Sequence, residues 1–406
     1  MPDPALGQAL AAAVDAAFEA EQVPLLQRLV DLPSHTYARA DVEACARALD
    51  EAAAALGLTC TKVPDHLDKF ADHRVYAPPA AGDGPALALV GHIDTVFPRS
   101  LGFLQFRRDG DKVFGPGVLD MKSGLTSVLF ALRAIKAAAP EQFAALPVRF
   151  VVVSDEEVGS PSSARMYREL APKLTAGLVF ESGRENDTIV TRRKGGGLFT
   201  ITVRGKAAHA GNDHAAGVNA IHALALIVDL VERLTDYERG VTLNVGLIEG
   251  GTAKNTVPAL ARCQVDARFE TVADAERVTE ALKGLAADPF ALLPHAPARL
   301  RGVSVEVEGG VTRPPMEASP ASQRLRGVYE PYAAACGLQV GECPLQGGGS
   351  DANLLAAGGV PCIDGLGPYG QYFHQTEEWS SLDSLRRRTA ALACFLVDHA
   401  GTPFRG

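Results

Sequence analysis

The chain has 406 residues and a mass of 42.6 kDa, a length that favours two or three domains. Hydrophobic residues make up 47% and charged residues 21% of the chain, which excludes a disordered, collagen-like or coiled-coil protein. The net charge of −9 argues against general nucleic-acid binding, and no run approaches the roughly 18 apolar residues of a transmembrane helix, so we expect neither a nucleic-acid nor a membrane partner.

The N-terminal segment up to Pro33 has the spacing of an amphipathic helix rather than the pattern of a secretory signal. Asp3 stands where a signal peptide carries Lys or Arg, and Asp15, Glu19 and Glu21 interrupt the apolar run. The seven cysteines are scattered and form no CxxC pair, as is typical of reduced thiols. We therefore expect a cytoplasmic protein.

Strands and helices alternate through residues 1–193. Wholly apolar runs predict buried strands at 86–90, 148–153 and 177–180, and a helical pattern covers about 122–139 before Pro140. Apolar strands alternating with helices are typical of a mostly parallel sheet with helices on both faces. We interpret residues 1–193 as the first part of the larger, α/β domain.

A different pattern begins at Lys194, where three glycines follow and polar and apolar residues then alternate. Residues 194–312 have the β-α-β-β-α-β order of a ferredoxin-like domain, which we expect to be inserted into the larger one. The expected elements are a strand from Phe199, a helix at 218–234, strands at 242–250 and 261–269, a helix at 273–286, a loop at 287–302 and a strand at 304–309. Residues 313–406 then form the second part of the α/β domain, ending in a helix at 382–399.

Acidic and histidine side chains follow the predicted strands of the α/β domain. They are His92 and Asp94 after the first strand, Asp120 before the helix, Glu156 and Glu157 after the second strand, Glu181 after the third, and His374 in a late loop. Any one such acid is usually a helix cap or part of a solvated turn. Together, at the edge where parallel strands end, their charges would repel one another. Carboxylate and imidazole are ordinary ligands of divalent metals, so the pattern predicts a pair of metals that relieves this repulsion.

The sequence resembles the M20 family of dinuclear zinc peptidases, and within it the carboxypeptidase G2-like, or glutamate carboxypeptidase, branch. The resemblance covers nearly the whole chain in nine ordered stretches: GHIDTV, GVLDMKSG, SDEEVGS, FESG, KAAHAGN, GGTAKNTVP, DARF, GGGSDAN and the loop around His374. It implies a catalytic α/β domain that holds two metals and an inserted ferredoxin-like lid that forms a homodimer.

The resemblance also implies roles for the residues at the strand ends. One metal would be bound by His92, Asp120 and Glu181, and the other by Asp120, Glu157 and His374, with Asp120 bridging the two. Asp94 would hydrogen-bond the far nitrogen of His92 and fix its tautomer. Glu156 would be the general base, which takes a proton from water and returns it to the leaving amine.

In the inserted domain, the resemblance assigns oxyanion stabilisation to His209, acting in the active site of the partner subunit. Asn255 resembles the family's substrate-binding asparagine, although a glycine-rich hairpin loop alone would explain it. Arg268 either forms an ion pair with Asp266 or clamps a substrate carboxylate, and Arg313 is a second candidate for that clamp.

The GGGSDA stretch would place Gly348 beside the substrate, since small residues let a ligand approach the backbone closely. The stretch lacks the GK[ST] signature of a phosphate-binding loop, which argues against a nucleotide. Asp351 alternatively caps the helix that follows it.

We expect a homodimeric hydrolase with two Zn²⁺ per chain, with Co²⁺ or Mn²⁺ as alternative metals. It would cleave an amide bond in a small peptide or N-acyl amino acid and release a C-terminal amino acid, glutamate or another acidic residue. An N-acyl-amino-acid deacylase, a desuccinylase or a dipeptidase would share every metal ligand and is the alternative within the family. A non-catalytic binding protein is disfavoured, because the base Glu156 and all five ligands are present.

Overall fold

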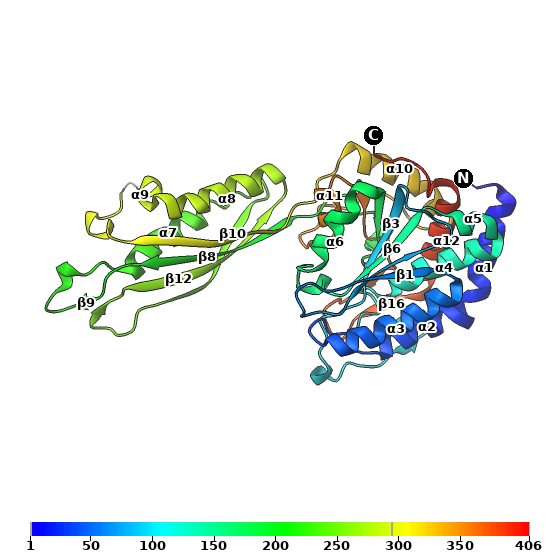
Figure 1. Ribbon diagram of the computed structural model, residues 1–406, viewed down its shortest axis with the longest axis horizontal. Helices are drawn as coiled ribbons and strands as arrows, with labels where there is room; N and C mark the ends of the chain where they lie inside the picture. Colours follow the sequence, from blue (N-terminus) through cyan, green and yellow to red (C-terminus); the bar gives the residue numbers. More distant parts are fainter. Residues whose placement is uncertain (1, 294, 406) are drawn as a thin grey trace. The chain divides into compact units, whose positions relative to one another are not determined.

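The computed structural model describes residues 2–293 and 295–405, and these residues form two compact units (Figure 1). Unit 1 consists of the residues up to Arg192, Ala318–Gln346 and the residues from Ser350 onward, and unit 2 of Arg193–Glu317 and Gly347–Gly349. Unit 2 extends past residue 312, because Arg193 and Met316 exchange two backbone hydrogen bonds of 3.0 Å where the chain enters and leaves it.

Unit 1 is built on a six-stranded sheet with the order β1-β2-β6-β3-β7-β14. The strands are β1 (Thr59–Val63), β2 (His73–Ala77), β3 (Ala86–His92), β6 (Val148–Val153), β7 (Leu174–Val179) and β14 (Cys362–Ile363). Neighbours among β6, β3, β7 and β14 run parallel, whereas β1 and β2 pair antiparallel at one edge. The prediction of a mostly parallel sheet is therefore confirmed.

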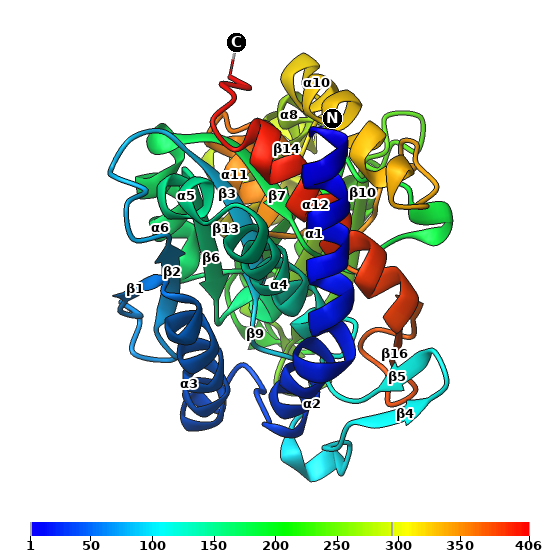
Figure 2. The ribbon, with the colours of Figure 1, turned by 90° about the vertical axis from the view of Figure 1, so that its right-hand side faces the viewer.

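Helices cover both faces of this sheet, and alternate residues of β7 contact different helices on the two faces. Ala176 and Leu178 join a core with residues of α1 (Pro4–Ala17), α3 (Arg39–Leu56), α4 (Lys122–Ala138), α10 (Pro320–Ala335) and α12 (Leu382–His399). Figure 2 looks onto this helical layer, in which α1 contacts both α4 and α12. Gly177 faces the opposite way, toward Leu355 of α11 (Asp351–Ala357), which contacts α6 (Ser163–Leu170).

The remaining elements of unit 1 are short. A π-helical turn, Phe18–Gln22, separates α1 from α2, so the single N-terminal helix that the sequence predicts is divided before Pro24. The other elements are α2 (Val23–Asp31), α5 (Pro140–Ala145) and a small antiparallel sheet of β4 (Arg107–Asp109), β5 (Lys112–Phe114), β16 (Trp379–Ser381) and β15 (Gly370–Gln371).

Unit 2 has a four-stranded antiparallel sheet with the order β10-β12-β8-β13 and two long helices, in the chain order β-α-β-β-α-β. Its elements are β8 (Gly195–Arg204), α7 (Ala220–Glu232), β10 (Thr242–Gly250), β12 (Leu260–Phe269), α8 (Val272–Ala287) and β13 (Ser304–Arg313). The alternating residues Phe199, Ile201 and Val203 are buried against the helices. A two-stranded pair, β9 (Ala208–His209) with β11 (Thr256–Val257), extends this unit.

The expected loop at 287–302 contains helical turns at α9 (Pro289–Leu292) and Ala298–Leu300. The Asp288 side chain accepts hydrogen bonds from two backbone N–H groups of α9, a local cap that the apolar periodicity does not reveal. All seven cysteines are free thiols, and five of them are buried. Within the described part of the chain, none of the helices combines the length and hydropathy needed to span a bilayer.

Asp65 makes the stability of unit 1 depend on pH. Its buried carboxylate accepts hydrogen bonds from the N–H groups of Leu67, Lys69 and Phe70 at 3.1, 2.6 and 2.7 Å. Burial acts to raise the pKa of Asp65, but the bonds from Phe70 and the other donors outweigh it and lower the pKa to about 2. Because the folded pKa lies below the unfolded value, this stabilisation is complete above pH 4 and is lost as the pH falls toward 2.

We expect Asp65→Asn to lower the free energy of unfolding by about 2 kcal/mol at pH 7 and by clearly less near pH 2.5. Urea denaturation at the two pH values measures this difference. An equal loss at both pH values would contradict the assignment of the effect to the ionised carboxylate.

Candidate metal centre

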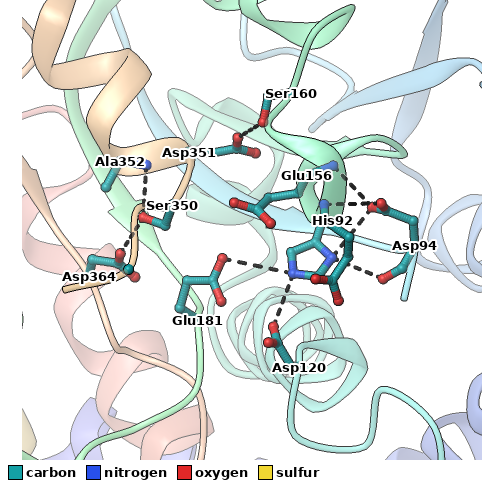
Figure 3. Close-up of polar contacts among 12 residues, drawn as sticks. His92, Asp94, Asp120, Glu156, Ser160, Glu181, Ser350, Asp351, Ala352 and Asp364 are labelled. Carbon is teal, nitrogen blue, oxygen red and sulfur yellow. Dashed lines mark hydrogen bonds and ion pairs between the residues drawn. The ribbon is translucent and has the colours of Figure 1, made fainter. Parts of the chain in front are cut away.

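The candidate metal ligands all come from unit 1, around the edge where its parallel strands end (Figure 3). His92 is the last residue of β3, Glu157 lies in the turn after β6, and Glu181 follows β7 by two residues. Asp120 lies two residues before α4, and His374 comes from the loop between β15 and β16. This edge is where open α/β sheets bind their ligands, because connections leave the strand ends in opposite directions there.

His92, Asp120 and Glu181 form the first ligand set. The Nε2 atom of His92 lies 3.1 Å from Oδ1 of Asp120 and 3.8 Å from Oε1 of Glu181. His92 and Glu181 are buried. One ligand atom from each of the three residues lies within 4.8 Å of the others, as the ligands of a single metal must.

Asp120, Glu157 and His374 form the second set, again with ligand atoms within 4.8 Å of one another. The Nε2 atom of His374 lies 3.3 Å from Oδ2 of Asp120 and 3.0 Å from Oε2 of Glu157. Asp120 thus turns one oxygen to each histidine, which is the geometry of a bridging carboxylate. His374 has a φ of +64°, a backbone conformation that non-glycine residues rarely adopt and that concentrates at functional sites.

The electrostatics of these residues fit cations between them. Burial, together with the charge of Asp120, raises the pKa of Glu157 to about 7 and that of Glu181 well above its ordinary value. Hydrogen bonds to Asp120 and Glu157 raise the pKa of His374 to about 10. Glu157 Oε1 is buried and has no hydrogen-bond partner within the described chain. A buried carboxylate oxygen that accepts no hydrogen bond is costly unless a cation lies beside it. Together with two imidazoles and further carboxylates, it makes up the kind of ligand set that binds a pair of divalent metals.

Asp94 is fully buried and organises both the histidine and the acidic turn. The Nδ1 atom of His92 lies 3.0 Å from the main-chain oxygen of Asp94 and 3.4 Å from its carboxylate Oδ1, so its Nε2 faces the ligands. The carboxylate also accepts from Thr36 Oγ1 at 2.8 Å and from the N–H groups of Glu156 and Glu157 at 3.3 Å. Asp94 thus contacts one residue of each candidate ligand set, His92 and Glu157, but belongs to neither set itself.

Glu156 begins the 3-10 turn Glu156–Val158, next to the ligand Glu157. In Figure 3 its carboxylate is drawn between Asp351 and Glu181. The negative charge of Glu156 contributes to the raised pKa of both Glu181 and Glu157, as expected for a carboxylate close to the ligands.

Glu378 is a residue of this centre that the sequence patterns did not indicate. It is fully buried, and its Oε1 accepts hydrogen bonds from the N–H groups of Leu119 and Asp120 at 2.7 and 3.1 Å. Burial raises its pKa to about 8. The sequence offers one signal for Glu378, its position four residues after the candidate ligand His374.

Glu378→Ala is expected to weaken metal binding by about 10–100-fold, because it removes the group that holds the backbone of Asp120, the residue shared by both ligand sets. Glu378→Gln keeps an oxygen for both N–H groups and should lose much less. Titration of each metal-free variant with Zn²⁺ measures the difference, and equal affinities in Glu378→Ala and the unaltered chain would contradict it.

The other predicted residues lie in unit 2. His209 is exposed in β9, where its Nδ1 accepts from the N–H groups of Gly211 and Asn212 at 3.2 and 3.1 Å, which leaves its Nε2 turned away from this loop. Asn255 is exposed just before β11, and its main-chain oxygen accepts from Ala210 N at 2.9 Å. The structure therefore brings His209, at the end of β9, and Asn255, just before β11, next to each other.

The two candidate arginines flank one glycine of the unit 2 sheet. Arg268 on β12 and Arg313 on β13 both pair with Gly196 on β8. Arg268 is half-exposed and makes two hydrogen bonds, of 2.8 and 2.9 Å, to the Asp266 carboxylate, which is the ion pair that its spacing allowed. Arg313 is buried against Gly349. A Cβ atom added to Gly349 would lie only 2.4 Å from the Cδ atom of Arg313.

The GGGSDA stretch divides between the two units. The main-chain oxygen of Gly348 accepts from Arg193 Nη1 at 3.0 Å within unit 2. Ser350, rather than Asp351, is the N-cap of α11, since its side chain accepts from Ala352 N at 3.2 Å. The expectation that Asp351 caps the helix is therefore wrong, because the serine before it already supplies that oxygen.

Residues 88–398 match the profile of peptidase family M20/M25/M40. The chain belongs to this family. Carboxypeptidase G2 from a Pseudomonas species is 28% identical over 379 residues, covering 93% of this chain and 88% of that protein. The succinyl-diaminopimelate desuccinylase of Granulibacter bethesdensis is 26% identical, covering 94% and 98% respectively.

Solved structures show the same fold. Aminopeptidase PepT from Bacillus cereus aligns with a TM-score of 0.72 at 24% identity, over 93% of this chain and 98% of that one. A dinuclear metal-binding M20 peptidase from Bacillus subtilis aligns with a TM-score of 0.65 at 18% identity, over 96% and 100%. With family membership and the two ligand sets, the protein is an M20-type metallopeptidase or amidohydrolase.

Proposed function

We propose that the protein is a dinuclear zinc hydrolase that releases a C-terminal amino acid, glutamate or another acidic residue, from a small peptide or N-acyl amino acid. The observation that carries this proposal is the pair of ligand sets sharing Asp120, with Glu156 beside them. The similarity to carboxypeptidase G2 over 93% of the chain favours a carboxypeptidase.

His92, Asp120 and Glu181 would hold one zinc ion, and Asp120, Glu157 and His374 the other. Zinc ions bound there would lower the pKa of water and polarise the scissile carbonyl. Glu156 would accept the proton of the attacking water and deliver it to the leaving nitrogen, so the amide is hydrolysed without a covalent enzyme intermediate. Asp94 would keep His92 in the tautomer whose Nε2 faces the ligands.

The residues of unit 2 would bind the substrate. Arg268 or Arg313 would hold its terminal carboxylate, since a guanidinium matches a carboxylate with two parallel hydrogen bonds. For Arg268, the substrate would have to replace the carboxylate of Asp266. Asn255 and the backbone at Gly348 would contact the rest of the substrate.

A homodimer in the cytoplasm is part of the proposal. β10 is an edge strand of the unit 2 sheet, and Leu247 and Ile248 on it are more than 60% exposed. An exposed apolar edge strand pairs readily with another strand, here the same strand of a second copy. In such a dimer, His209 would stabilise the oxyanion in the partner's active site.

The trans role of His209 gives a prediction about mixed dimers. His209→Ala and Glu156→Ala are each expected to be nearly inactive, but subunit exchange at equal amounts should restore about one quarter of the unaltered activity, because each mixed dimer has one complete site. Native mass spectrometry monitors the exchange while product release is measured. Mixed dimers without activity would exclude the trans role.

A desuccinylase is the second candidate, favoured by the 26% identity to succinyl-diaminopimelate desuccinylase over 94% of the chain. The experiment that separates the two offers zinc-loaded protein one pool of N-acyl glutamates, N-succinyl and N-acetyl amino acids and dipeptides, and identifies products by mass spectrometry. Release of acidic amino acids by the unaltered chain, but not by Glu156→Ala, supports the carboxypeptidase. Release of neutral or basic amino acids favours the alternative, and no release contradicts both.

A further inference from the structure

Asp351 is a buried carboxylate for which the proposed reaction gives no role. It is the first residue of α11 and only 1% exposed. The helix does not need it as a cap, because Ser350 accepts from Ala352 N and the Asn353 side chain accepts from Ser350 N at 2.9 Å. Burying a carboxylate is costly, so its hydrogen-bond partners indicate what it does.

Two hydroxyl groups donate to Asp351. Ser160 Oγ donates to its Oδ1 at 2.5 Å, and Tyr167 OH donates to its Oδ2 at 2.7 Å (Figure 3 draws the first bond). Ser160 and Tyr167 are themselves buried. A carboxylate, when ionised, forms hydrogen bonds about twice as strong as those between neutral groups. Tyr167 lies within the helix α6, so the bond from Tyr167 connects Asp351 to a regular element.

Ser160 connects this carboxylate to the acidic turn. The turn begins at Glu156, is closed by Gly159 N donating to Glu156 O at 2.8 Å, and ends where Ser160 N donates to Asp155 O at 2.9 Å. Ser160 has a φ of +58°, a conformation that a serine adopts only when its surroundings hold it there.

Two of the hydrogen bonds at the start of the turn are longer than the side-chain bond at its end. At its start, the N–H groups of Glu156 and Glu157 donate to Asp94 over 3.3 Å, which is long for a hydrogen bond. At its end, Ser160 Oγ donates to Oδ1 of Asp351 over a short distance, 2.5 Å. Ser160 therefore connects the far end of the turn that carries Glu156 and Glu157 to Asp351.

We propose that Asp351 is a positioning residue, which through Ser160 fixes the turn that carries the general base Glu156 and the metal ligand Glu157. The role for Glu156 rests on the proposed hydrolase function, whereas the role for Glu157 requires only metal binding. Asp351 comes two residues after Gly349, so it lies close to the point where the chain returns from unit 2 to unit 1.

Asp351→Ala is expected to weaken Zn²⁺ binding at one of the two sites by about 10–100-fold and to lower kcat by a similar factor, with KM changed less than about twofold. Asp351→Asn keeps an oxygen for Ser160 and should recover most of both losses. Calorimetric titration of metal-free protein with zinc chloride measures binding without any substrate. Steady-state assays on the substrate found in the panel give kcat and KM.

Ser160→Ala and Tyr76→Phe complete the test. Ser160→Ala should reproduce much of the Asp351→Ala effect, and adding it to Asp351→Ala should cause no further loss. Tyr76→Phe is the matched control, because Tyr76 is buried and donates to Asp50 at 2.6 Å in a part of unit 1 without metal ligands. It should lower thermal stability but leave zinc affinity unchanged. Should Asp351→Ala fail to fold, Ser160→Ala and Asp351→Asn decide the proposal.

Wild-type zinc affinity and kcat in folded Ser160→Ala or Asp351→Ala would overturn the proposal, as would equal losses in Asp351→Asn and Asp351→Ala. Failure of the hydrolase function would instead appear as absence of turnover in the zinc-loaded unaltered chain. The zinc titrations would still measure the effect of Asp351 on metal binding in that case. Failure of this proposal and failure of the proposed function are therefore distinguishable.

Discussion

Replacing Glu156 with glutamine is expected to lower kcat by about 10²–10⁴-fold while two metal ions remain bound per chain. The side chain belongs to neither ligand set, so the shape of the metal centre should survive its change. Glutamine has nearly the same volume as glutamate but cannot accept a proton. Metal content by mass spectrometry and single-turnover kinetics on the identified substrate measure the two quantities separately.

Glu157→Gln is the matched control for this prediction, because Glu157 is the neighbouring residue on the same turn and belongs to the second ligand set. It should lose metal as well as activity. A Glu156→Gln variant with near-normal turnover would remove Glu156 from the proposed mechanism. A variant that loses metal like Glu157→Gln would make Glu156 a ligand instead.

The fold of unit 1 could be predicted because its signals are local and strong. Apolar runs predicted β3, β6 and β7, and the helix predicted at 122–139 is α4 at 122–138. The antiparallel β1 could not be predicted in the same way, since four of its five residues are exposed and it shows no apolar run. The turns at 289–292 and 298–300 depend on a side-chain cap and on prolines, which periodicity does not report.

At the candidate metal centre, the proposed ligands were easier to predict than the residues that contact them. His92 and Glu181 follow strands that the apolar runs predict, and the resemblance to the M20 family implied their roles as ligands. Glu378 and Asp351 act through backbone N–H groups and hydroxyls from segments distant in the sequence: Asp351 is 191 residues from its partner Ser160. The contact between Asp351 and Ser160 exists only after the chain has folded, so no spacing in the sequence reveals it.

Replacing Asp120 with alanine is expected to remove both metals, whereas replacing a ligand of one set should remove one. Asp120 is the single residue shared by the two sets, with Oδ1 toward His92 and Oδ2 toward His374. Its loss leaves each set two ligands and removes the negative charge between two imidazoles. Two ligands from the chain are fewer than the three protein ligands typical of a catalytic zinc site.

Titration of metal-free Asp120→Ala with zinc chloride, beside Glu181→Ala and His374→Ala, measures this difference. We expect two strong sites in the unaltered chain, one in each single-set variant and none in Asp120→Ala, with no detectable turnover in the last. Asp120→Asn keeps one oxygen acceptor and should bind one ion more weakly, because an amide cannot bridge two cations with charge on both oxygens. Two tightly bound ions in Asp120→Ala would show that the sets are independent, and the shared carboxylate would then be a hydrogen-bond acceptor for His92 and His374 rather than a bridge.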